Sequence, residues 1–166
     1  MTAGRRQHYK TVKSRGRYRS LYERRIAAYL SSKLIKFEYE GMVIDYFRPA
    51  VNTVICPLCG PIKGMVSRRY TPDFKLHNNV IIEAKGRFTS ADRAKMRAVI
   101  KQHHELDIRL LFMRDNAIKG AAGKETSYTE WATIYGFPSA IGPEVPDDWL
   151  AGRNRPTRLE KAYKEL

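Results

Sequence analysis

The sequence predicts a small α/β domain, on three observations. Its 166 residues suit one domain, and no internal repeat divides them. A content of 43% hydrophobic and 11% aromatic residues supports a folded core rather than a wholly disordered chain. Apolar residues recur at helical spacing in some segments and at strand spacing in others, in the order helix, several strands, helix, strand, helix.

The first predicted elements are a helix and two short strands. Ser20 and Glu23 have the spacing of a capping box, and apolar residues then recur at helical spacing, so we expect a helix over 21–33. Gly41 separates two strand-like runs, Phe37–Glu40 and Met42–Phe47. Residues 48–69 are expected to be irregular, because prolines and glycines surround a Cys-Pro-Leu-Cys motif: Pro49, Cys56, Pro57, Cys59, Gly60, Pro61 and Gly64.

A hairpin and further helices are predicted beyond this stretch. Tyr70–Leu76 and Val80–Lys85 have strand composition, and the short turn His77-Asn78-Asn79 joins them. Three later elements are expected in turn: a helix that Ser90 caps and that ends near His104, a strand over Ile108–Met113, and a short helix between a capping box at Ser127 and Gly136. Pro146–Leu150 reads as one further helical turn.

Positive charge is concentrated at the N-terminus. The chain carries a net charge of +14, and residues 1–25 hold nine basic side chains against one acid. A basic arm on a nearly neutral body is typical of a polyanion binder, most often of nucleic acid. A solvated tail that serves solubility is the alternative, and a membrane surface is disfavoured because no strong apolar face accompanies the charge. The candidate DNA-binding residues of this arm are Arg5, Arg6, Lys10, Lys13, Arg15, Arg17 and Arg19.

These features divide the chain into a flexible basic arm over 1–19, a folded domain over 20–150 and a basic tail over 151–166. The chain has no apolar run of the ~18 residues that span a bilayer and no secretory apolar segment. Two cysteines exclude a disulfide scaffold. We therefore expect a cytoplasmic protein without a membrane partner.

The strongest chemical signal is Pro72-Asp73 followed by Glu83-Ala84-Lys85. Alternation along a strand places Glu83 and Lys85 on one face with Ile81, and Ala84 on the other. Charged residues on so apolar a strand are costly unless they are paired or bind something. Asp73 and Glu83, brought together by the hairpin, would form an oxygen-donor site for Mg²⁺ or Mn²⁺. The alternative is a surface hairpin with an ordinary Glu–Lys pair, since this motif also occurs by chance.

This arrangement resembles the PD-(D/E)xK nuclease superfamily, and a longer collinear set of residues resembles the phage endonuclease I family of T7-like phages. The runs that carry the second resemblance are Ser32–Glu40, Tyr70–Phe74, Glu83–Gly86, Glu105–Arg109, Lys119-Gly120, Thr126–Tyr128 and Trp149. The resemblance covers about residues 19–150. It implies a restriction-endonuclease-like core, with a mixed sheet flanked by helices, in an intertwined, domain-swapped homodimer.

The resemblance also implies roles for particular residues. Asp73, Glu83 and the main-chain carbonyl of Ala84 would bind the metal, and Lys85 would be the catalytic lysine. Glu23, from the partner chain's helix, would complete a site for two Mg²⁺ ions, with Mn²⁺ able to substitute. By itself Glu23 is explained by its place in the capping box.

The implied function is metal-dependent cleavage of branched DNA, with four-way (Holliday) junctions resolved by paired nicks during phage replication and host DNA also degraded. The N-terminal basic segment would grip the branched DNA. Two alternatives stay open: a related nuclease with another DNA target, and a non-catalytic nucleic-acid-binding protein whose acids merely pair with lysines.

Cys56 and Cys59 depart from the family pattern, because they lie in about a dozen inserted residues. Cys-x-x-Cys followed by Gly is half of a zinc knuckle, and tetrahedral zinc takes four ligands. A second chain, or the histidines His77, His103 and His104, would have to supply the remainder. Free thiols or a redox pair are the alternatives. His103 and His104 themselves read as residues that close a helix.

Overall fold

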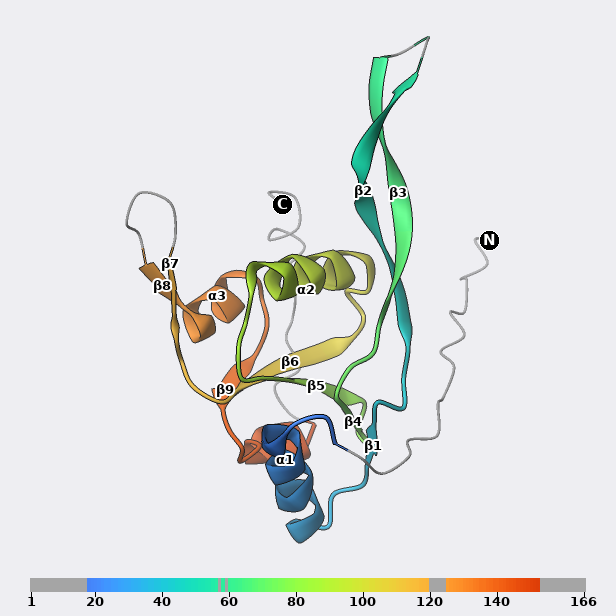
Figure 1. The fold of residues 1–166 in the computed structure, drawn as a ribbon. Coiled ribbons are helices and arrows are strands. Elements are labelled where there is room, and N and C mark those ends of the chain that lie inside the picture. The colour runs from blue at the N-terminus through green and yellow to red at the C-terminus, as the bar shows by residue number, and fades with distance from the viewer. Residues whose placement is uncertain (1–17, 57, 59, 120–124, 153–166) are drawn as a thin grey trace.

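The fold is built on a five-stranded mixed sheet, seen in a computed structural model that describes residues 18–56, 58, 60–119 and 125–152. The strand order is β1-β4-β5-β6-β9. Neighbours are antiparallel from β1 to β5 and parallel from β5 to β9 (Figure 1). The strands are β1 (Phe37–Tyr39), β4 (Phe74–Leu76), β5 (Val80–Lys85), β6 (Asp107–Phe112) and β9 (Ser139–Ile141). The predicted α/β class and mixed sheet are confirmed.

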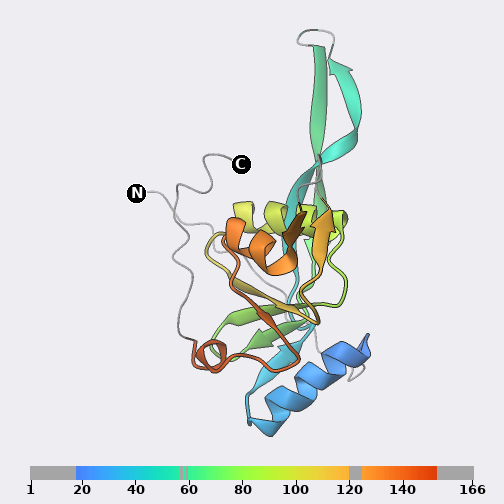
Figure 2. The same ribbon diagram turned by 90° about the vertical axis from the view of Figure 1, so that its left-hand side faces the viewer.

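Helices cover both faces of this sheet. Two of them, α2 (Ser90–Gln102) and α3 (Tyr128–Ile134), lie on one face, and α1 (Leu21–Ser32) lies on the other (Figure 2). The short α4 (Asp147–Leu150) packs on the α1 side through Trp149. A hydrophobic core lies on each face of the sheet, and strand β5 contributes to both. Ile81 packs with the α2 and α3 residues, whereas Ile82 packs with those of α1. The predicted alternation along β5 is therefore confirmed.

The helix starts largely follow their capping signals. Ser20 caps α1 and accepts a hydrogen bond from the Glu23 N–H, and Ser127 caps α3 in a reciprocal capping box. The prediction that Ser90 caps α2 is wrong by one residue. Thr89 is the N-cap, and its bonds with Asp92 run both ways. Thr89 rather than Ser90 is the N-cap because an acidic residue, Asp92, lies three positions beyond Thr89 and completes the capping box.

The expectation that residues 48–69 are irregular is wrong. Strands β2 (Ile44–Cys56) and β3 (Gly60–Tyr70) form one long antiparallel hairpin, which projects away from the central sheet (Figure 1). Prolines are tolerated here because each strand of a two-stranded ribbon has an unpaired edge where the missing N–H goes unused. The register shifts between Pro49 and Thr53, which accommodates the irregular sequence.

Sequence reasoning also misplaced or missed other strands. The predicted Tyr70–Leu76 strand is two strands, because β3 ends at Tyr70 and β4 begins at Phe74. A small hairpin of β7 (Ala117–Lys119) and β8 (Glu125–Ser127), and the edge strand β9, were not expected. Each has three residues, too few to show a periodicity.

The end of α2 anchors the base of the long hairpin. The Gln102 side chain bonds both backbone groups of Phe47, each at 2.8 Å. The buried His103 ring lies 2.7 Å, through Nε2, from the Asp45 carbonyl oxygen. His103 is the C-cap residue of α2, consistent with its prediction as a residue that closes the helix.

A buried ion pair lies in the middle of the fold. Arg109 is fully buried on β6 and donates two hydrogen bonds to Asp107, at 2.9 and 2.8 Å. Its guanidinium also lies over the Trp149 ring. A bidentate pair of this kind compensates both charges, so the loss of one partner leaves the other charge buried alone.

We expect Arg109→Met to lower the free energy of unfolding by about 3–5 kcal/mol, because Asp107 loses its partner. Urea denaturation followed by circular dichroism measures this. The double variant Arg109→Met/Asp107→Asn should regain part of the loss, since no unpaired charge remains. A double variant as unstable as the single one would contradict the explanation.

Candidate active site

The residues that the sequence predicted from Asp73 to Lys85 come together at the C-terminal end of β5. The Glu83 carboxylate is almost fully buried, and its Oε1 lies 2.9 Å from Lys85 Nζ. The Asp73 carboxylate approaches from the residue before β4, and its Oδ2 accepts a hydrogen bond from the Ala84 N–H at 2.8 Å. The predicted side chains thus share one small site.

The β4–β5 hairpin produces this approach. Asn79 has a positive φ of 67°, which Asn tolerates in a tight turn, and the two strands pair with Phe74 opposite Ile82. This register places Asp73, one residue before Phe74, beside the end of β5. A short turn and a local register are sufficient to bring together carboxylates that are ten positions apart in the sequence.

The two carboxylates leave an excess of negative potential. Burial and the charge of Glu83 raise the pKa of Asp73 to about 8, with a further contribution from Glu23, although the Ala84 N–H and Lys85 oppose the shift. Both burial and the nearby Glu83 charge disfavour the ionised form of Asp73 in the metal-free protein. A bound divalent cation would relieve this, and carboxylate and carbonyl oxygens are the donors that Mg²⁺ and Mn²⁺ prefer.

Lys85 stays protonated in this environment. Burial lowers its pKa, but the charge and hydrogen bond of Glu83, together with Asp92 and Asp73, raise the pKa above its usual range. Asp92 contacts Lys85 Nζ at 3.3 Å. A lysine held in the charged form donates hydrogen bonds and stabilises negative charge, and it is not a general base.

Three residues of the site were missed by sequence reasoning. The buried Tyr70 hydroxyl donates to Glu83 Oε2 at 2.7 Å, Lys95 Nζ lies 3.1 Å from Glu83 Oε1, and Asp92 pairs with Lys85. Tyr70 belongs to a run that carries the family resemblance, so the sequence contained an indication that it belongs to the site. The sequence contained no such indication for Lys95 and Asp92, because they reach Glu83 and Lys85 only through the packing of α2 on the sheet.

Glu23 does not join this cluster. Its carboxylate accepts hydrogen bonds from the Arg19 N–H, the Ser20 hydroxyl and the Tyr39 hydroxyl, at 2.9, 2.8 and 2.6 Å. Within the described ranges, no three Asp, Glu, His or Cys side chains are grouped so that they could hold a metal ion. The helix that carries Glu23 packs on the sheet of its own chain. Its charge nevertheless contributes to the raised pKa of Asp73.

Other predicted site residues fall wholly or partly outside the described part of the chain. Of the basic arm, only Arg19 is described, and its Nε pairs with Glu40 at 2.8 Å. The backbone of Cys56 pairs with Gly60 in the long hairpin, but the Cys56 side chain and the whole of Cys59 lie outside the described residues.

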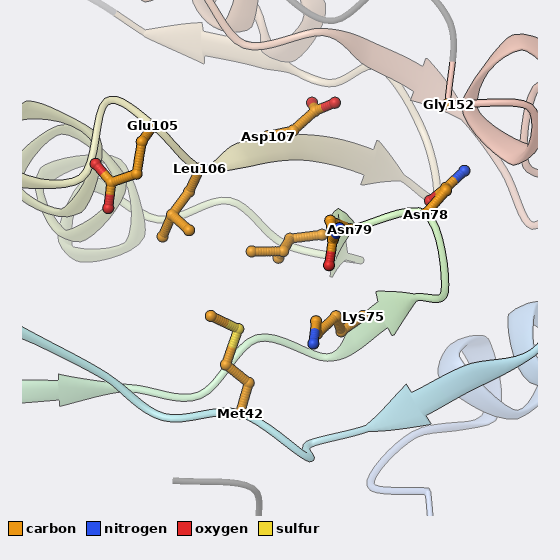
Figure 3. Close-up of a pocket in the computed structure, with 9 residues that line it drawn as sticks. Met42, Lys75, Asn78, Asn79, Glu105, Leu106, Asp107 and Gly152 are labelled. Carbon is orange, nitrogen blue, oxygen red and sulfur yellow. The ribbon is translucent and has the colours of Figure 1, made fainter. Parts of the chain in front are cut away.

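A separate pocket of about 430 Å³ lies at the opposite end of β5 and β6 (Figure 3). Its lining includes Asn79, just before β5, and Asp107, the first residue of β6, together with Lys75 and Asn78. Glu83 and Lys85 do not line it. The carboxylate–lysine cluster at the end of β5 is therefore distinct from this pocket.

The fold and site define an α/β protein with a buried carboxylate–lysine centre at the end of a central strand. The phage endonuclease I family model matches residues 3–164. Endonuclease I of Escherichia phage T7 is 36% identical over 141 residues, which covers 85% of this chain and 83% of the relative. Endodeoxyribonuclease 1 of Enterobacteria phage T3 is 39% identical over 120 residues, 72% of this chain and 68% of the relative.

The chain therefore belongs to the phage endonuclease I family, and the resemblance predicted from its motifs is confirmed. Membership makes the protein an endonuclease. None of the helices in the described ranges is both long enough and apolar enough to span a bilayer.

We expect Asp73→Asn to stabilise the metal-free protein in a pH-dependent way. The folded-state pKa of Asp73 is about 8, against 3.8 as the ordinary value, so between these values the folded state binds more protons than the unfolded state. Wild-type stability then falls as pH rises through this window. The variant has no carboxyl group at this position and does not lose stability in this way. Its free energy of unfolding should equal that of wild type at pH 3.5 and exceed it by about 2–4 kcal/mol at pH 8.5.

Urea denaturation of both proteins in EDTA, from pH 3.5 to 8.5, measures the difference. Glu144→Gln, at an exposed position, controls for the loss of a negative charge elsewhere. An Asp73→Asn variant that is less stable than wild type at pH 8.5 would contradict the explanation that the ionised Asp73 carboxylate destabilises the metal-free protein.

Proposed function

We propose that this endonuclease is a metal-dependent enzyme that cuts branched DNA and resolves four-way junctions by paired nicks. The observation that carries the proposal is the meeting of Asp73, Glu83 and Lys85 at the end of β5, in a chain of this family. The T3 relative is an endodeoxyribonuclease, which supports DNA as the substrate. The host cytoplasm is the compartment in which such a phage enzyme would act.

The proposed metal ligands are Asp73, Glu83 and the main-chain carbonyl of Ala84, with Mg²⁺ as the natural ion and Mn²⁺ as a substitute. Oxygen donors and an uncompensated negative potential support this choice. A bound divalent ion polarises a phosphodiester oxygen and lowers the pKa of a water molecule. Lys85, held protonated by Glu83 and Asp92, donates hydrogen bonds to the charge that develops on the phosphate.

Substrate recognition is proposed to rest on phosphate contacts rather than on base readout. The basic arm supplies point charges, of which Arg19 is exposed over 71% of its side chain. Contacts of this kind position a protein on nucleic acid without reading its sequence. Branch shape would then select the substrate, and a homodimer would place two cleavage sites in two-fold symmetry on a four-way junction.

A second metal ion and a shared active site are further parts of the proposal. Glu23 lies near enough to raise the pKa of Asp73, which supports an electrostatic link between α1 and the metal site. In a dimer that exchanges α1, the partner's Glu23 would occupy the position beside Asp73 that Glu23 of the same chain has here. Completing the metal site requires Glu23 to release the hydrogen bonds that now hold it beside Ser20 and Tyr39.

Zinc at Cys56 and Cys59 stays a prediction. The backbone of Cys56 and Gly60 pairs at the far end of the long hairpin, away from the central sheet, so two hairpins could bring four thiols together only across a dimer (Figure 1).

We expect Lys85→Ala to abolish junction cleavage while junction binding is retained, because Lys85 stabilises developing charge and contributes little to affinity. Labelled four-way junction and matched linear duplex are incubated with Mg²⁺, Ca²⁺ or EDTA at fixed salt, and Lys101→Ala serves as the charge control. Wild type should nick the junction in pairs with Mg²⁺ only, and the rate should fall at least about 100-fold in Lys85→Ala.

Equal cutting of both substrates by wild type would remove junction selectivity from the proposal. Tight binding without cleavage in Mg²⁺ or Mn²⁺ would make the protein a nucleic-acid binder instead of a nuclease.

Mixing two inactive variants tests whether the active site is shared. If Glu23 acts on the partner's site, a dimer of one Glu23→Gln chain and one Asp73→Asn chain contains one intact site. After joint refolding of equal amounts, about half of the dimers contain one chain of each kind, and each of these has one intact site. About one quarter of the wild-type number of sites is therefore restored, and a mixed dimer makes single nicks. Variants mixed without refolding are the control. Two inactive variants that stay inactive after joint refolding would show that each site is built from one chain.

A further inference from the structure

Lys95 is a second ammonium group at the active site. It lies on α2, and its Nζ is 3.1 Å from Glu83 Oε1 and 4.7 Å from the centre of the Tyr70 ring. Its side chain is 23% exposed, whereas the Glu83 side chain is 2% exposed. Lys95 thus reaches a buried carboxylate from the solvent side of the cluster. The Asp73…Glu83-x-Lys85 motif does not include it.

The hydrogen-bonding capacity of Glu83 is nearly used up by these contacts. Oε1 receives Lys85 at 2.9 Å and Lys95 at 3.1 Å, and Oε2 receives the Tyr70 hydroxyl at 2.7 Å. A carboxylate oxygen has two lone-pair positions, so both positions of Oε1 are taken by ammonium groups. A divalent cation that binds Oε1 must therefore displace one of the two lysines.

The two lysines differ in how firmly they are held. Lys85 contacts Asp92 at 3.3 Å in addition to Glu83. The other contact of Lys95 is a cation–π interaction with the face of the Tyr70 ring, so Lys95 is paired with one carboxylate and Lys85 with two. Lys95 is the lysine that can leave at the smaller cost.

We propose that Lys95 is a positioning residue that stands in for the metal. Its ammonium neutralises Glu83 in the metal-free protein and leaves Oε1 when a divalent cation binds. This inference rests on the metal site of the proposed function. It explains what compensates the buried Glu83 carboxylate without metal, and it supplies a displaced positive charge beside a site that takes a phosphodiester.

The proposal predicts an unusual direction for a substitution beside a metal site. Lys95→Met removes a competing cation from Glu83, so divalent ions should bind more tightly, roughly fivefold or more. Lys95→Arg retains the positive charge, and its affinity should stay within about twofold of wild type. A residue that only supported the fold would leave affinity unchanged or weaken it when removed.

Mn²⁺ binding to the full chain is measured by isothermal titration calorimetry, without DNA, for wild type, Lys95→Met and Lys95→Arg. Lys101→Met is the matched control, because it makes the same change at an exposed position of the same helix. Urea denaturation in EDTA and in saturating Mn²⁺ gives a second readout. Lys95→Met should be less stable than wild type in EDTA, and in saturating Mn²⁺ this difference in unfolding free energy should shrink by RT times the logarithm of the gain in affinity.

Unchanged or weaker Mn²⁺ binding by Lys95→Met would overturn the stand-in role, and the proposed function would survive as long as wild type binds Mn²⁺. The same tightening in Lys95→Arg would also overturn it, because charge would not be the cause. If Lys95→Met does not fold, Lys95→Gln replaces it, because this variant also removes the charge and should bind Mn²⁺ more tightly. It is then compared with Lys95→Arg, which should bind Mn²⁺ like wild type. No Mn²⁺ binding by wild type would overturn both proposals.

Discussion

The fold is organised around one buried carboxylate. Glu83 lies on the central strand β5 with only 2% of its side chain exposed, and an isolated charge there would cost several kcal/mol. Its compensation comes from three separate elements: Tyr70 at the end of β3, Lys85 on β5 itself and Lys95 on α2. These elements must keep their relative positions for Glu83 to keep its hydrogen-bond and ion-pair partners. The same packing therefore supports the fold and the site.

The neighbouring Asp73 shows that this compensation is incomplete. Two ammonium groups serve Glu83, yet the pKa of Asp73 remains raised to about 8, chiefly because of burial and the Glu83 charge. Strain of this kind is typical of functional sites, where a group is held in an unfavourable state until its ligand arrives. A site rich in carboxylate oxygens is suited to a divalent cation, so the raised pKa of Asp73 and the proposed chemistry have one origin.

The long β2–β3 hairpin is tied to this centre although it projects from the body. Tyr70, the last residue of β3, bonds Glu83 directly. Gln102, the last residue of α2, and its C-cap His103 hold the backbone of β2 at Phe47 and Asp45. Helix α2 thus contacts the hairpin at its C-terminal end and supplies Lys95 near its middle. A two-stranded ribbon has little stability alone, so these anchors at its base are what orient it.

The sequence by itself determined the features that depend on near neighbours along the chain. These are the capped helices, the alternation along β5, and the approach of Asp73 to Glu83 through a turn of a few residues. Tertiary structure alone decided how the base of the β2–β3 hairpin is held by Gln102 of α2, and the arrival of Lys95 and Asp92 at the site. Periodicity and capping are set within about four residues, whereas these contacts join distant segments whose meeting depends on the packing of the whole core.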